Sequence, residues 1–167
     1  MFEKYVSAAK ELGAVHAVEF TRNDIVYDPR TILKCLFGCE DYGKIHTCPN
    51  LRSPLSTADY KRLLREYKGG IIIGHGDKNK SQDVSLEIEK TCFLDGFYFA
   101  FSLSDCAVCE TCAIADGKGC RCPVKARPAF HSVGIDVFKT VRRFGLPLAV
   151  LQSESEEPNW YSAVFID

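Results

Sequence analysis

Five cysteines stand between residues 106 and 122, and no other feature constrains the chain as strongly. The segment reads Cys106-Ala-Val-Cys-Glu-Thr-Cys112, followed by Gly119-Cys-Arg-Cys-Pro123. Thiols this close together either pair as disulfides or bind a soft cation. The chain has nine cysteines, an odd number, and residues 1–13 show an amphipathic helical pattern where a signal peptide would carry a hydrophobic block. Because disulfide scaffolds are typically small and secreted, the sequence favours thiolate ligands in a reducing compartment.

Charge and length exclude several classes of protein. Lys and Arg number 21 and Asp and Glu number 22, so neither sign dominates. Nucleic acids and membrane surfaces are usually met by excess basic charge, and no apolar run approaches the roughly 18–20 residues that span a bilayer. We therefore expect a cytoplasmic protein with neither nucleic acid nor membrane as a partner. A length of 167 residues suits a single domain, residues 1–167.

The spacing Cys106-x2-Cys109-x2-Cys112 points to an iron–sulfur cluster. Two-residue spacers let one tight loop supply three thiolates to a cubane cluster, as in bacterial ferredoxins, which then add a further cysteine followed by proline. Cys120 fills that role here, and Cys122, which precedes a proline, is a further candidate. A structural zinc site usually takes two Cys-x2-Cys pairs, so the third cysteine is surplus to it. We predict a [4Fe–4S] cluster, with zinc or redox-active thiols as the alternatives.

A second candidate site is Cys35-x3-Cys39-x8-Cys48, in a segment that contains glycine and proline. These three cysteines predict a second cluster or metal site; the alternative is that they are small buried residues. An iron with three protein ligands keeps a Lewis-acidic position for a substrate. The candidates for a fourth ligand are a small molecule, Cys122, Cys92, which is expected to be a core residue, and His46, which is expected to be on the surface or hydrogen-bonded.

Hydrophobic periodicity predicts an α+β fold in one domain, with about four strands, three to four helices and two cysteine-rich metal-binding loops. Helices are expected over residues 2–12, 56–67, 84–103 and 135–144, with Thr57 as the cap of the second. Strands are expected over residues 14–20, 70–74, 146–151 and 160–166. Residues 31–55 are expected to be irregular, and residues 78–83 to form a polar turn.

These motifs together resemble one particular family. The segments that carry the resemblance are the two cysteine motifs, residues 89–98, Cys120-Arg-x-Pro123, Ala126-Arg-Pro128 and Gly134-Ile-Asp-Val137. The family consists of small cysteine-rich proteins, mainly of anaerobic archaea and bacteria, described as predicted metal-binding proteins of unknown function. The resemblance implies that the metal ligands are Cys35, Cys39, Cys48, Cys106, Cys109, Cys112 and Cys120. Cys122 falls on the variable position of the Cys-Arg-x-Pro motif, and Ala129-Phe130-His131 replaces the Ser-Met-Glu that is common in the family.

Three functions agree with these observations. The first is an iron–sulfur protein with one or two [4Fe–4S] clusters that passes single electrons to a redox partner protein. The second is an enzyme with an open iron on the Cys35, Cys39 and Cys48 site. The third is a zinc-stabilised structural or adaptor domain, in which metal binding contributes folding free energy. A homodimer is compatible with each, and the sequence leaves open whether the protein is an enzyme.

Overall fold

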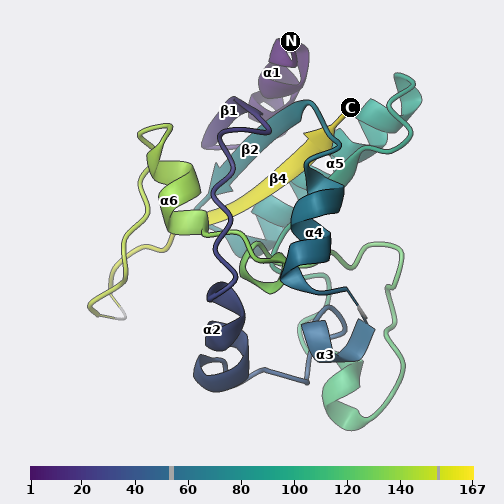
Figure 1. Cartoon of the computed structure of the whole chain (residues 1–167), viewed down its shortest axis with the longest axis vertical. Helices are drawn as coiled ribbons and strands as arrows, with labels where there is room; N and C mark the ends of the chain where they lie inside the picture. The colour runs from purple at the N-terminus through teal and green to yellow at the C-terminus, as the bar shows by residue number, and fades with distance from the viewer. Residues whose placement is uncertain (53–54, 154) are drawn as a thin grey trace.

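A four-stranded antiparallel sheet forms the centre of the computed structural model, which describes residues 1–52, 55–153 and 155–167 (Figure 1). The strands lie in the order β1-β2-β4-β3, and their bounds are β1 His16–Thr21, β2 Gly69–His75, β3 Phe101–Leu103 and β4 Trp160–Ile166. The predicted α+β fold with a small four-stranded sheet is confirmed.

Strand β2 is buried on both faces because its side chains alternate between the two sides of the sheet. Ile71, Ile72 and Ile73 are each 0% exposed. The strand begins with Gly69 and Gly70, where a Cβ atom would overlap the carbonyl oxygens of neighbouring strands. The glycines therefore allow the backbones of β1 and β4 to approach the start of β2.

Helices cover both faces of this sheet (Figure 1). The helix bounds are α1 Glu3–Glu11, α2 Thr31–Gly38, α3 Pro49–Arg52, α4 Thr57–Leu64, α5 Lys78–Leu94 and α6 Val137–Arg142. Helices α1 and α5 pack on the face that carries Ile71 and Ile73. Leu64 of α4 and Val141 of α6 pack on the face that carries Ile72. The result is a three-layer arrangement with two apolar cores. Among the described residues, no helix has the length and apolar character that crossing a bilayer would require.

The longest helix differs from the predicted one at both ends. Helix α5 begins at Lys78, because the side chain of Asp77 accepts hydrogen bonds from two backbone N–H groups of the first turn. The predicted polar turn over 78–83 is therefore helical. The helix ends at Leu94, and Gly96 follows with a φ of +98°. The apolar residues beyond it were expected to continue the helix, but Phe101–Leu103 form β3 instead.

Three other boundaries also differ from the sequence prediction. Residues 146–151 are not a strand; the free edge of β4 is taken by β3. The segment that was expected to be irregular contains α2 and α3, although residues 53 and 54 lie outside the described part. Ser56, and not Thr57, caps α4, since its side chain accepts from the backbone N–H of Asp59 and the Asp59 carboxylate accepts in return.

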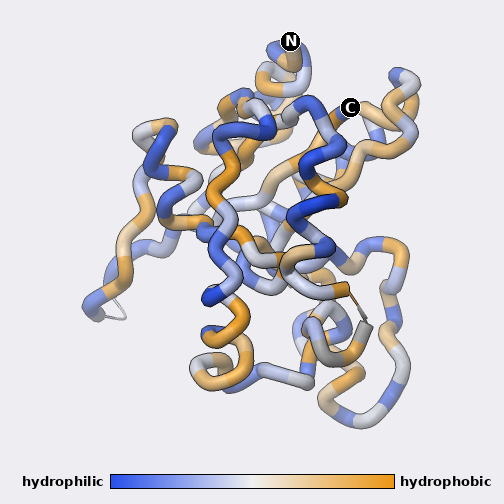
Figure 2. The backbone as a smooth tube through the Cα atoms, viewed as in Figure 1, coloured by the Kyte–Doolittle hydropathy of each residue, from blue (hydrophilic) through white to orange (hydrophobic). Residues whose placement is uncertain are grey.

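Both cysteine segments lie at one end of the molecule, beyond the sheet (Figure 1). We call residues 31–52 and 105–128 the cysteine region. Figure 2 shows that the hydrophobic stretch of α2 belongs to this end. Phe37 is 85% exposed there and Leu33 is 50% exposed, so apolar burial is incomplete in this part of the fold.

Candidate metal centre

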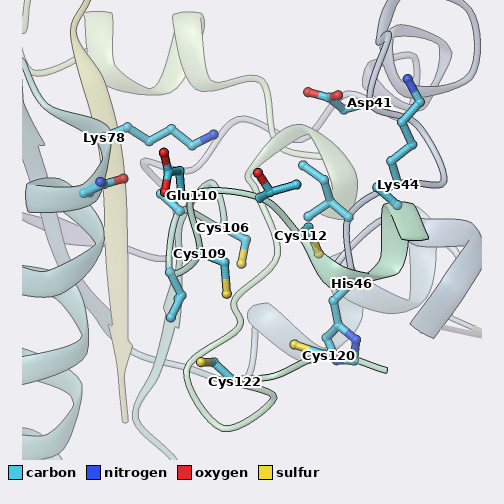
Figure 3. A pocket seen from close by; sticks show the side chains of 16 residues that line it. Asp41, Lys44, His46, Lys78, Cys106, Cys109, Glu110, Cys112, Cys120 and Cys122 are labelled. Carbon is cyan, nitrogen blue, oxygen red and sulfur yellow. The ribbon is translucent and has the colours of Figure 1, made fainter. Parts of the chain in front are cut away.

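The five cysteines between residues 106 and 122 line one pocket of about 430 Å³, which we call the thiol pocket. Figure 3 shows their sulfur atoms arranged around a common space. The five are Cys106, Cys109, Cys112, Cys120 and Cys122. The structure therefore brings together the predicted ligands of the first site, and it includes Cys122 among them.

The chain returns to the thiol pocket through a tight turn after Cys112. A short 3-10 helix, Ala113–Asp116, ends at Gly117, whose φ is +71°. The backbone N–H of Lys118 donates to the carbonyl of Ala113, which closes the turn. Since φ values in this range favour glycine, the glycine in the spacer allows the second pair of thiols to face the first three.

Gln82 of α5 connects the two halves of the cysteine loop. Its side chain is 1% exposed. Its Oε1 accepts from the backbone N–H of Ala107 at 2.6 Å, and its Nε2 donates to the carbonyl of Lys125 at 3.3 Å. One buried amide thus holds residues on both sides of the thiol pocket against the helix.

A second connection from α5 is the ion pair between Glu89 and Arg127. The side chains are only 16% and 13% exposed. Arg127 Nε donates to Glu89 Oε2 at 2.9 Å, and a second guanidinium nitrogen contacts Oε1. Arg127 also donates to the carbonyls of Val124 and Ala126, while Glu89 accepts from the backbone N–H of Ser102. This network fixes the chain that follows Cys122 to both α5 and β3.

The other cysteine motif lines a separate cleft of about 260 Å³, the three-cysteine cleft. Its thiols are those of Cys35, Cys39 and Cys48, and Cys106 also lines it. Cys35 belongs to α2 and is 4% exposed, and burial raises the pKa of its thiol to about 11, with smaller contributions from Cys39 and Cys48. The motif therefore converges on one space, as its spacing predicts.

The thiols of the thiol pocket affect one another electrostatically. Burial raises the pKa of Cys106, and negative charge on Cys112 or Cys120 would raise it further, while backbone N–H groups of Val108 and Arg127 act in the opposite direction. Grouped thiols of this kind resist simultaneous ionisation in the absence of a cation. A bound metal reverses that preference, because thiolate is the form that ligates.

The two spaces are neighbours that share part of their lining. Asp41, Ile45, Lys78 and Cys106 border both of them. Lys78 is the first residue of α5, and its Nζ lies 5.3 Å from the centroid of the Trp160 ring. The sequence analysis did not single out Lys78 or Gln82, because each looks like an ordinary polar residue of a helix.

Two residues considered as extra ligands have well-defined places. Cys92 is 0% exposed in the core between α1 and α5, as expected, and it lines neither space. His46 is 8% exposed and lines the thiol pocket, although it is close in sequence to Cys48. Of the two expectations for His46, the surface position is wrong, because the side chain is buried beside the thiol pocket.

The donor set can be compared with what a metal or a cluster requires. Among the described residues, no three His, Cys, Asp or Glu side chains are grouped so as to hold a metal ion. Thiolates around one zinc ion lie within about 4 Å of each other, since each Zn–S bond is about 2.3 Å. A cubane cluster binds each thiolate to a different iron, which spaces them more widely. The thiol pocket of about 430 Å³ has a lining rich in cysteine, and thiolates are ligands of both zinc and iron–sulfur clusters.

Comparison with known families gives one result. The family model described as "Predicted metal-binding protein (DUF2284)" matches residues 19–166, which is most of the chain and includes all nine cysteines. Searches of the curated proteins and of the solved structures returned no significant match.

Proposed function

Because the chain belongs to the DUF2284 family of predicted metal-binding proteins, we propose that its thiols hold iron–sulfur clusters and that it passes single electrons to a redox partner protein. The observation that carries this proposal is the thiol pocket, in which five cysteine side chains surround one space. A soft donor set this rich in thiols is typical of iron–sulfur proteins.

The proposed ligands are the cysteines predicted from the two motifs. By their spacing, a first [4Fe–4S] cluster would take Cys106, Cys109, Cys112 and Cys120, with Cys122 as a further candidate, and the division of the thiols between the two clusters is taken up below. A second cluster takes Cys35, Cys39 and Cys48. When bound, such clusters supply a one-electron redox couple. We place the protein in the reducing cytoplasm of an anaerobe. The nine free thiols support a reducing compartment, because disulfides are rare there.

Other residues of the two sites suit an electron carrier. Lys44 and Lys78 line the thiol pocket together with Asp41 and Glu110, so the formal charges of these side chains cancel and the charge of the pocket changes mainly with the cluster itself. The thiol pocket and the three-cysteine cleft share a wall, so two clusters held there would be neighbours. Neighbouring clusters would provide a path for an electron to enter at one side and leave at the other.

The first experiment is to measure iron, acid-labile sulfide and zinc per chain in protein purified without oxygen. We expect about eight iron and about eight sulfide, with broad absorption near about 400 nm from thiolate-bound iron. Cys109→Ala should lose about half of the iron. Cys92→Ala is the matched control, because Cys92 lines neither space, and it should lose none. A colourless chain with stoichiometric zinc and no iron would contradict the proposal.

A further inference from the structure

We infer that Cys106 is the fourth ligand of the three-cysteine cleft and that Cys122 takes the vacated position in the thiol pocket. The eight clustered thiols then divide into two complete sets of four, Cys35, Cys39, Cys48 and Cys106 in one and Cys109, Cys112, Cys120 and Cys122 in the other. This assignment rests on the proposed function, since it distributes ligands between the two proposed clusters. It departs from the division that the sequence spacing suggests.

The position of Cys106 is the first observation behind this assignment. It lines both the thiol pocket and the three-cysteine cleft, and it is the only cysteine among the described residues for which the two linings overlap. The preceding residue, Asp105, also lines the three-cysteine cleft, so the backbone enters the cysteine loop along that cleft. Cys106 therefore lies on the boundary between the two sites.

The other candidates for the fourth position lie elsewhere. Cys122 and His46 line the thiol pocket and not the three-cysteine cleft. Cys92 is 0% exposed in the core beside α1. Of the thiols outside the Cys35, Cys39 and Cys48 motif, Cys106 alone borders their cleft.

Cys122 is well placed to complete the thiol pocket. Its side chain lines this pocket together with those of Cys109, Cys112 and Cys120. The guanidinium of Arg121 donates to the carbonyl of Thr111, which ties the Cys120–Cys122 segment to the Cys109–Cys112 segment. These contacts hold four thiols together without Cys106.

Dividing one run of cysteines between two clusters has a chemical precedent. In two-cluster ferredoxins the last cysteine of a closely spaced run ligates the other cluster. Here the first cysteine of the run would do so. The non-thiol side chains Asp41, Asp105 and His131 also border the three-cysteine cleft, but thiolate is the usual ligand of a cubane iron.

The test compares single-cysteine variants of the full chain, purified without oxygen and reconstituted with iron and sulfide. We expect about eight iron in the unmodified protein and about four in Cys106→Ala, Cys122→Ala, Cys48→Ala and Cys109→Ala. The decisive readout is the electron paramagnetic resonance spectrum of the cluster that remains after reduction. The spectrum of Cys106→Ala should match that of Cys48→Ala, and the spectrum of Cys122→Ala should match that of Cys109→Ala.

Three outcomes in the variants would overturn the assignment, and so would one in the unmodified protein. One is a Cys122→Ala chain that keeps about eight iron and the original spectrum; another is a Cys106→Ala chain that matches Cys109→Ala. The third is loss of the cleft cluster in His131→Ala or Asp105→Asn while Cys106→Ala retains it. Circular dichroism checks folding, and Cys106→Ser replaces any Cys106→Ala chain that does not fold. Spectral change on adding cyanide or a small thiol to the unmodified protein would also count against it, because an open iron would then exist.

Failure of the proposed function would look different from failure of the assignment. An unmodified chain with zinc and no iron overturns the iron–sulfur proposal alone. The ligand sets are then determined from cobalt-substituted spectra of the same four variants. If Cys106→Ala and Cys48→Ala lose the same ion, the assignment stands; if Cys106→Ala and Cys109→Ala lose the same ion, it is wrong.

Discussion

The sheet and the cysteine region are stabilised in different ways. In the sheet, Ile71, Ile72 and Ile73 are 0% exposed, and both faces are covered by helices. In the cysteine region, Phe37 and Val124 are 85% and 84% exposed. Apolar burial therefore accounts for the sheet, whereas polar connections to α5 hold the part of the cysteine region over residues 105–128, and the metal binding that we propose would add to them. A metal site that is formed by loops commonly contributes folding free energy in this way.

The largest expected effect comes from breaking the ion pair that joins the two parts. Glu89→Ala leaves the buried guanidinium of Arg127 without its carboxylate and the N–H of Ser102 without its acceptor. Removing one partner of a buried pair is strongly destabilising, so we expect the free energy of unfolding to fall by about 3 kcal/mol. Chemical denaturation of the reconstituted protein measures this.

The control for this change is on the same helix. Glu87 is 57% exposed and pairs only with Lys90, so Glu87→Ala should change the free energy of unfolding by no more than about 0.5 kcal/mol. Glu89→Gln keeps an acceptor for Ser102, so its loss of free energy of unfolding should lie between the losses in Glu89→Ala and Glu87→Ala. If Glu89→Ala costs no more than Glu87→Ala, the ion pair does not hold the cysteine region to α5.

A smaller effect is expected at Gln82. Gln82→Ala leaves the N–H of Ala107 and the carbonyl of Lys125 without their partners. We expect the free energy of unfolding to fall by about 2 kcal/mol. Iron should also transfer faster to a chelator, because the loop that carries the thiols is less well held. Unfolding in denaturant and the transfer of iron to the chelator can both be followed by absorbance in the same preparation.

Two further variants show whether the amide of Gln82 itself controls the rate at which iron is lost to a chelator. Asp83→Ala changes an exposed neighbour and should leave the chelation rate as it is. Gln82→Glu keeps the acceptor for Ala107 but loses the donor to Lys125, so an intermediate rate is expected. Equal rates in Gln82→Ala and Asp83→Ala would mean that the cysteine region does not depend on this contact.

The smallest effect concerns Cys92, the one cysteine of the apolar core. Burial raises the pKa of its thiol to about 12, whereas an unfolded cysteine titrates near about 8.5. Between these two pKa values the folded state keeps the thiol proton, whereas the unfolded state loses it. The contribution of Cys92 to the free energy of unfolding is therefore complete below the pKa of the unfolded state, and it falls as the pH rises toward the pKa of the folded state. This contribution should fall by about 1 kcal/mol from about pH 8.5 to about pH 9.5.

The comparison with Cys92→Ala isolates this contribution, since several buried tyrosines also titrate in alkaline solution. The difference in the free energy of unfolding between the two proteins should depend on pH in this range. In metal-free protein near pH 8.5, a thiol reagent should modify the exposed Cys39 and leave Cys92 intact. Rapid modification of Cys92 would show that the core is not as closed as its burial indicates.

Much of the sheet could be predicted from the sequence because its signals are local. The run of isoleucines in β2 and the aromatic and β-branched residues of β4 depend only on the residues of those strands. The secondary-structure prediction was wrong where tertiary contacts determine which element forms. The aromatic residues after Leu94 have the composition of a buried helix, but Gly96 ends the helix and β3 pairs with β4.

The cysteine motifs were recognised from their spacing, but spacing does not determine how thiols from two loops are shared. The position of Cys106 between the two sites follows from how the chain leaves β3, and this is a property of the folded structure. Gln82 gave no signal on its own. Gln82 lies on the buried face of α5 with Val84 and Ile88, and its place on that face would have been the clue, because buried amides need hydrogen-bond partners.

Gln82 and Glu89 are seven residues apart on α5, which is about two helical turns. One residue inserted between them would rotate the second by about 100° and pull it away from its partner. By contrast, a Cβ at Gly119 would meet nothing within 4 Å. Relatives or engineered versions of this protein should therefore vary in length at the tip of the cysteine loop, while the distance between the two helix positions stays fixed. The same pair of positions would be needed to graft the loop onto another helix.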